Sequence, residues 1–88
     1  MKIRKLNAMP YAQAKVIEYD NGGKILVSYT TYVIYVTAEG WLDITGLYSA
    51  TTRRHISAFM RELGLEYSLA KMLYKDGHRY NIYTGEVA

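Results

Sequence analysis

The sequence contains no cysteine, which excludes disulfide bonds and thiolate metal sites. It has no apolar run near the roughly 20 residues that a membrane-spanning helix needs, and its basic start lacks the apolar stretch of a secretion signal. A glycine-rich phosphate loop, a nucleophile elbow and a spaced pattern of metal-ligating residues are also missing. These absences predict a cytoplasmic protein without cofactor or metal, and they favour a non-enzymatic role.

The composition is that of a folded chain, because half of the residues are apolar and 22% are charged. Residues 1–88 are too few for two separate cores, which predicts a single domain. The net charge of +3 is unevenly spread, since basic regions at residues 1–15 and from residue 47 onward flank an acidic middle. This distribution permits an anionic partner, although ordinary solubilising charge would give the same counts.

The first half of the chain predicts antiparallel strands. A strand over residues 15–19 is followed by the sequence DNGG, a tight-turn signal because Asn and Gly tolerate positive φ angles. The segment over residues 24–37 is rich in β-branched and aromatic residues, but it is too long for one strand. We therefore expect a bend or break near residues 28–31, and a shorter strand over residues 41–44.

The second half predicts two helices. Apolar residues recur with i, i+3, i+4 and i+7 spacing over residues 51–63, and Gly64 follows as a C-terminal glycine. A second helix is expected over residues 67–75 and a final strand over residues 79–83. The predicted fold class is α+β, with an antiparallel sheet of three to five strands packed against a two-helix hairpin. Residues 1–10 suit either an edge strand or a mobile basic arm.

The start of the first predicted helix holds more polar groups than a helix cap requires. One hydroxyl is enough to cap a helix, whereas free N–H groups together with arginines suit a phosphate. A plain cap with a basic surface remains the alternative. The candidate ligand-binding residues are Ser49, Thr51, Thr52, Arg53, Arg54 and His55, with Arg61 assisting and with Tyr29 and Tyr48 as stacking groups.

The arrangement of helix, Gly64 and helix is also compatible with a helix-turn-helix, which supports a second hypothesis of a small DNA- or RNA-binding regulator. A helical hairpin packed on the sheet would give the same pattern. In the nucleic-acid hypothesis, the phosphate contacts come from Lys2, Arg4, Lys5, Lys71, Lys75 and Arg79.

Two short motifs lie between residues 28 and 64. One is Ser-Tyr-Thr-Thr at residues 28–31, and the other is Tyr-Ser-x-Thr-Thr-x-x-His at residues 48–55. In these motifs the chain resembles a group of small uncharacterised proteins encoded mainly by phages and prophages. The resemblance implies an accessory protein that antagonises bacterial immunity in the host cytoplasm. Such a protein would bind a nucleotide-like ligand, or it would inhibit a CRISPR–Cas effector by direct protein–protein contact.

The Tyr-rich segment over residues 24–37 also bears on assembly. An unpaired strand edge of that length is an aggregation hazard, so we expect it to pair with its counterpart in another subunit. The sequence therefore predicts a homodimer or a higher homo-oligomer.

Overall fold

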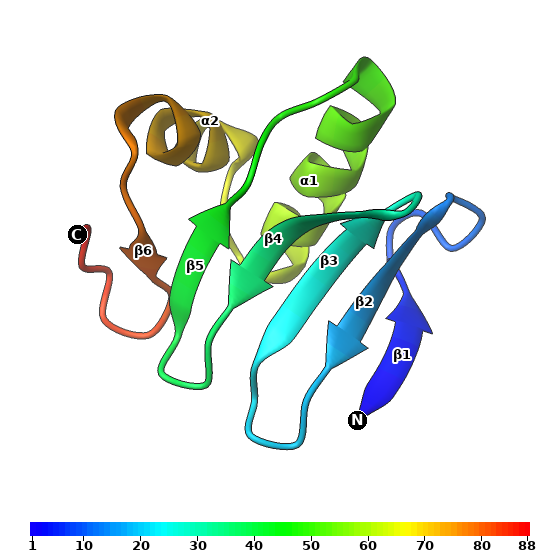
Figure 1. The fold of residues 1–88 in the computed structure, drawn as a ribbon, viewed down its shortest axis with the longest axis horizontal. Coiled ribbons are helices and arrows are strands. Elements are labelled where there is room, and N and C mark those ends of the chain that lie inside the picture. The colour runs from blue at the N-terminus through cyan, green and yellow to red at the C-terminus, as the bar shows by residue number, and fades with distance from the viewer.

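The computed structural model describes residues 1–88 and consists of an antiparallel sheet of six strands and two helices (Figure 1). The strands lie side by side in chain order, each hydrogen-bonded to the next. The elements are β1 (Lys2–Lys5), β2 (Ala14–Glu18), β3 (Lys24–Ser28), β4 (Thr31–Val36), β5 (Trp41–Ile44), α1 (Ala50–Glu62), α2 (Tyr67–Asp76) and β6 (Tyr80–Asn81). This confirms the α+β class and places both helices within one residue of their expected bounds.

The expected count of three to five strands is wrong, because β1 adds a sixth strand at the edge of the sheet. Of the two possibilities for the N-terminal segment, the structure shows the edge strand. β1 pairs with β2 over its whole length, from Lys2 opposite Glu18 to Lys5 opposite Lys15. Three of its four residues are basic, so its sequence lacks the β-branched and aromatic enrichment by which strands are usually predicted.

The long Tyr-rich segment breaks where expected, at the Tyr29–Thr30 link between β3 and β4. A β-bulge between Leu26 and Val27 then places the consecutive residues Val33 and Ile34 in the same core. Both β3 and β4 have a hydrogen-bonded neighbour on each side. The expectation of an exposed edge over residues 24–37 is therefore wrong, since these are the two central strands of the sheet.

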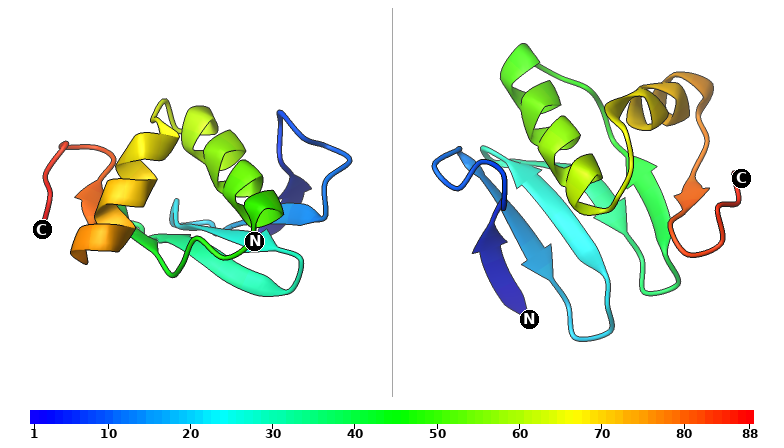
Figure 2. Two further views of the ribbon diagram at one scale, coloured as in Figure 1. Left: turned by 90° about the horizontal axis from the view of Figure 1, so that it is seen from above. Right: turned by 180° about the vertical axis from the view of Figure 1, so that it is seen from behind.

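Both helices cover the same face of the sheet, and the opposite face carries no helix (Figure 2). α1 lies against β3 and α2 against β5. The apolar stripe of α1, with Ile56, Phe59 and Met60 fully buried, packs on the strand residues that point to the same side. Complete burial of a side chain as large as Phe59 contributes about 1.5–3 kcal/mol to stability. The layer between the helices and the sheet contains the larger of the two buried apolar clusters, so it is the main core of the domain.

The ends of α1 are fixed by local hydrogen bonds. The Ser49 hydroxyl accepts a hydrogen bond from the Thr52 backbone N–H at 3.2 Å, which makes Ser49 the N-cap. At the other end Gly64 has a φ of 76°, a value that glycine adopts without strain. Its N–H donates to the Arg61 carbonyl, and the Leu65 N–H donates to that of Met60. This Schellman motif ends the helix and turns the chain toward α2.

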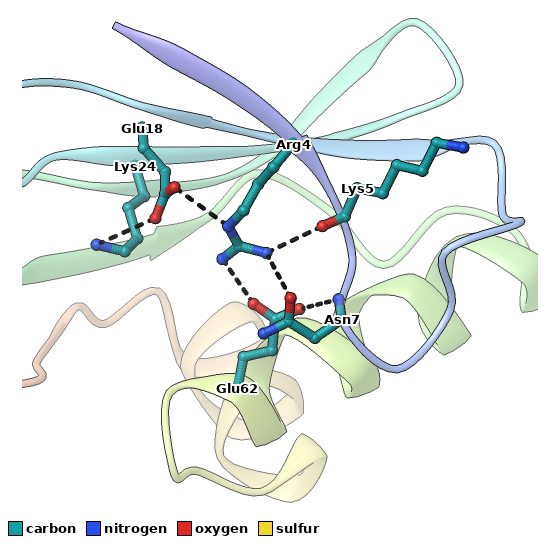
Figure 3. A network of polar contacts seen from close by, with 6 residues as sticks. All are labelled: Arg4, Lys5, Asn7, Glu18, Lys24 and Glu62. Atoms are coloured by element: carbon teal, nitrogen blue, oxygen red, sulfur yellow. Dashed lines mark hydrogen bonds and ion pairs between the residues drawn. The ribbon is translucent and has the colours of Figure 1, made fainter.

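An ion-pair network ties the edge strand β1 to the last turn of α1 (Figure 3). The Arg4 guanidinium donates to Glu62 at 2.7 Å and also pairs with Glu18 at 3.2 Å. The second oxygen of Glu62 accepts the Asn7 backbone N–H at 2.7 Å. The hydrogen bond from Arg4 to Glu62 is the main cause that raises the pKa of Arg4. This network gives the edge strand β1, whose only neighbour in the sheet is β2, a second attachment to the helical layer.

No helix in the structure has both the length and the apolar composition needed to cross a membrane.

Removing the carboxylate of this network should destabilise the fold. In a Glu62→Ala variant, Arg4 loses its closest partner and the Asn7 backbone N–H loses its acceptor, while the ion pair between Arg4 and Glu18 remains. We expect the free energy of unfolding, measured by urea denaturation, to fall by about 1–3 kcal/mol. Glu86→Ala removes a carboxylate that makes no side-chain hydrogen bond or ion pair and should change stability by less than about 0.5 kcal/mol. Equal losses in the two variants would contradict the role of the network.

Candidate functional site

A chain of buried hydroxyl and imidazole groups joins the first turn of α1 to the end of β3. The Ser28 hydroxyl lies 2.7 Å from Nδ1 of His55 and 2.9 Å from the Thr52 hydroxyl. All three side chains are buried, with exposures of 0% for Ser28, 1% for His55 and 5% for Thr52. Every buried polar side-chain atom has a hydrogen-bond partner, so the network is fully satisfied.

This burial corrects part of the sequence-based site. Thr52 and His55 were expected to face a ligand, but both point toward the sheet, where Ser28 supplies their partner. The hydroxyl of Ser49 is engaged as the N-cap and also donates to that of Thr52. The physical reason is the position of Ser28 at the end of a strand directly beneath the helix. Ser49, Thr52 and His55 therefore anchor α1, and their side chains are already occupied by hydrogen bonds within the chain.

The two proposed stacking residues flank this network without forming a pair. The Tyr29 ring packs on His55 with a centroid distance of 5.8 Å, while the Tyr48 hydroxyl is hydrogen-bonded to Thr45 at 2.9 Å. Both have positive φ angles, 56° for Tyr29 and 50° for Tyr48, and they are the only non-glycine residues that do. Such backbone conformations are costly for residues with a Cβ and cluster at constrained sites. The two strained residues thus adjoin the buried network, because Tyr29 directly follows Ser28 and Tyr48 directly precedes Ser49.

Burial lowers the pKa of His55 below its ordinary value of 6.5. The ring is therefore neutral at pH 7 and shares one hydrogen bond with Ser28 through Nδ1. A neutral imidazole can accept or donate here, because the Ser28 hydroxyl rotates to match either tautomer.

A basic groove lies between α1 and α2, next to this anchored turn. It has a volume of about 580 Å³ and contains three cationic side chains and no carboxylate. We call it the basic groove; its lining residues are Leu47, Arg53, Arg54, Ser57, Tyr67 and Lys71. The cations come from two different helices, so the tertiary structure brings together charges that are separated in the sequence.

The cationic side chains of the basic groove make few interactions within the chain. Arg53 donates one hydrogen bond of 3.3 Å to the Tyr48 carbonyl, whereas Arg54 and Lys71 make no side-chain hydrogen bond. None of the three belongs to an ion pair, because all four ion pairs of the structure involve other cations. Three unpaired cations in one hollow create a local positive potential that attracts an anion.

The remaining predicted ligand-binding residues lie outside the basic groove. Thr51 is exposed in the first turn of α1, and Arg61 is exposed in the last turn. Arg61 is two turns of helix away from Arg54, and neither Thr51 nor Arg61 lines the basic groove. Of the original set, the basic groove therefore contains Arg53 and Arg54.

The six residues of the nucleic-acid hypothesis do not share one surface. Three of them, Lys2, Arg4 and Lys5, lie on β1 at one edge of the sheet. Arg79 directly precedes β6, which is the opposite edge (Figure 1). Arg4 is occupied by Glu62 and Glu18, and Arg79 lies over the ring of Trp41. The other two, Lys71 and Lys75, share a hollow on α2 that also contains the carboxylate of Asp76.

Sequence reasoning missed Ser28, Ser57 and Tyr67. Ser57 follows Arg53 by four positions, so helical periodicity alone would have placed the two on one face. No local signal connects Ser28 to His55 or Tyr67 to Arg54, because these residues come from different elements. The structure also contains no group of three or more His, Asp or Glu side chains placed to hold a metal ion.

Comparison with known proteins gives one match. A family model described as "Family of unknown function (DUF8033)" matches residues 1–76, which end with the last residue of α2. No curated protein and no solved structure matches the chain. The match covers most of the chain and includes the complete basic groove.

The buried network can be tested by removing its central hydroxyl. In a Ser28→Ala variant, His55 and Thr52 lose a shared partner while remaining buried, and an unsatisfied buried polar group costs about 1–3 kcal/mol. We expect a loss of this size in the free energy of unfolding measured with urea. Ser68→Ala, at an exposed serine of α2, is the matched control and should cost less than about 0.5 kcal/mol. A loss no greater than that of the control would show that the network is unimportant for stability.

The lowered pKa of His55 predicts a dependence of stability on pH. Below about pH 6.5 the unfolded chain binds a proton at this position that the folded chain does not, so the free energy of unfolding falls as the pH falls. We expect urea denaturation midpoints to decrease between about pH 7.5 and about pH 5.5. The decrease should be smaller in His55→Gln and unchanged in His78→Gln, which alters the exposed histidine. An equal decrease in the wild type and in His55→Gln would contradict the assignment.

Proposed function

This chain belongs to the DUF8033 family of unknown function, and we propose that it is a non-enzymatic accessory protein that binds a phosphate-bearing, nucleotide-like ligand in the basic groove. The observation that carries the proposal is the meeting of Arg53, Arg54 and Lys71 in one hollow without a carboxylate. Uncompensated cations in a hollow repel one another, and a bound anion relieves that repulsion.

The chemistry of the lining favours phosphate within a larger ligand. Arginine presents paired N–H groups that match two oxygens of a phosphate, and Lys71 adds a more mobile point charge. The Ser57 hydroxyl can donate one further hydrogen bond. Tyr67 and Leu47 give the basic groove an apolar wall beside its cations. An aromatic ring next to phosphate-binding groups is suited to a nucleobase.

The buried network supports this role by holding α1 in place. Ser28 is hydrogen-bonded to both Thr52 and His55. Arg53 and Arg54 lie between these two residues in the sequence, so they project from a helical turn that is held in place. A site whose charges are already positioned loses less conformational entropy when the ligand binds. We therefore assign the motif at residues 48–55 two functions, one anchoring the helix and the other presenting its arginines.

The proposal extends to a biological context, which follows from the resemblance that the sequence analysis draws between residues 28–64 and phage-encoded proteins. We propose that the protein acts in the host cytoplasm and antagonises bacterial immunity by holding a nucleotide signal. Two alternatives use the same cations. In an inhibitor of a CRISPR–Cas effector they would contact the partner protein, and in a regulator that binds long nucleic acid they would contact its phosphates. The ligand experiment below separates these possibilities.

Small phosphate-bearing molecules should stabilise the protein through the basic groove. A ligand at 100 times its dissociation constant raises the free energy of unfolding by about 2.7 kcal/mol. We expect a thermal shift with at least one of pyrophosphate, nucleoside triphosphates and cyclic dinucleotides. Arg54→Ala and Lys71→Ala should each weaken binding about tenfold or more, because each removes a charge-assisted hydrogen bond.

Arg61→Ala is the matched control, since it removes an exposed arginine from the same helix outside the basic groove. It should leave the thermal shift unchanged. If only long oligonucleotides bind, and binding weakens steeply with salt, the nucleic-acid regulator is favoured instead. If no phosphate-bearing probe shifts the midpoint, the proposal fails and the search moves to a protein partner.

A further inference from the structure

The sheet face opposite the helices, which we call the open face, has an apolar centre of its own. Ile17, Ile25 and Val27 form a cluster separate from the main core and are at most 8% exposed, although no helix covers them (Figure 2). Larger side chains surround this cluster and remain partly exposed at its rim. They are Met1, Ile3, Tyr19, Tyr32 and Tyr35.

The strand register places these residues in rows that run across the sheet. One row runs from Ile3 through Ile17 and Ile25 to Tyr35 and ends at Asp43. The neighbouring row contains Lys5, Lys15, Val27 and Tyr32. The Tyr32 and Tyr35 rings lie close together, with centroids 6.2 Å apart. The open face is therefore a continuous apolar and aromatic surface over the middle of the sheet.

Charges of opposite sign flank this apolar centre. Lys5 and Lys15 lie at the flank formed by β1 and β2, and Asp43 lies at the flank formed by β5. None of these three side chains takes part in an ion pair or a side-chain hydrogen bond within the chain. The open face thus carries one unpaired basic flank and one unpaired acidic flank, separated by apolar residues.

We propose that the open face binds the open face of a second copy of this chain, related by a two-fold axis that runs along β3. This symmetry places Ile25 and Val27 against their own counterparts and brings Ile17 opposite Tyr35. It also sets β1 of each copy against β5 of the other, so that Asp43 lies opposite Ile3 of the second copy, one row away from its Lys5. This neighbouring pair of opposite charges occurs twice in the dimer. Two sheets packed face to face in this way form the core of a β-sandwich.

The charge pattern favours a second copy over other occupants. A lipid surface attracts clusters of basic residues, and the carboxylate of Asp43 opposes such binding. A two-fold partner needs a surface that is complementary to itself, and opposite charges on opposite flanks of an apolar centre meet that need. Because both helices lie on the other side of the sheet, the basic groove stays accessible in this dimer.

The size of the open face sets the expected strength of association. Five strands spaced about 4.8 Å apart, with about five residues each at 3.4 Å, cover roughly 400 Å² in projection. This is smaller than the roughly 800 Å² per partner of a standard interface. We therefore expect a dimer that dissociates on dilution.

Sedimentation equilibrium over about 1 µM to about 1 mM tests the proposal, because moderate affinities fall in this range. The wild-type mass should rise with concentration from that of the 10.1 kDa chain toward twice that value. Asp43→Lys and Lys5→Glu should each raise the dissociation constant about tenfold or more, because each places like charges together across the interface. An equimolar mixture of these two variants should associate again, since both contacts then join opposite charges.

Recovery in the mixture also shows that both variants are folded, so it separates a lost interface from a lost fold. Asp76→Lys, which makes the same charge change on α2, is the matched control and should leave association unchanged. A wild-type chain that stays monomeric up to about 1 mM would overturn the proposal and would leave the open face to a different protein. A mixture that associates no better than either variant alone would also overturn it.

Discussion

The packing of α1 across one face of the sheet is the interaction on which the other features of the structure depend. Its apolar stripe, centred on Ile56 and Phe59, meets β3 at the middle of the molecule. In a chain without disulfides, this single layer supplies most of the stabilising burial. Because the two helices are consecutive and share one side, the opposite face of the sheet receives no cover from this chain. The same packing also determines which residues of α1 are buried and which face the basic groove.

Polar interactions fix the position of α1 where apolar packing alone would let it slide. The Ser28 network holds its first turn, and the pair between Arg4 and Glu62 holds its last. Hydrogen bonds and ion pairs are directional, so each tolerates only a small displacement of the helix. The two attachments use residues far apart in the sequence, which links the N-terminal strand, the central strand and the helix into one unit.

This arrangement gives the two surfaces of the molecule different chemical characters. The helical side presents unpaired cations in the basic groove, and the bare side of the sheet presents an apolar centre with opposite charges on its flanks. A phosphate-bearing ligand suits the first surface and a second copy suits the second. Since the surfaces lie on opposite sides of the sheet, ligand binding and self-association would not compete for the same residues.

Local periodicity and turn chemistry were enough to predict the α+β class, both helices and the break within residues 24–37. They also identified Arg53 and Arg54 as neighbours on one helix. The inward position of Thr52 and His55 against Ser28, and the place of Lys71 beside the two arginines, depend instead on how the elements pack together. So do the positions of β1 as an edge strand and of residues 24–37 as central strands. The physical reason is that burial and electrostatic partnership depend on contacts between elements, and spacing along a single element does not specify them.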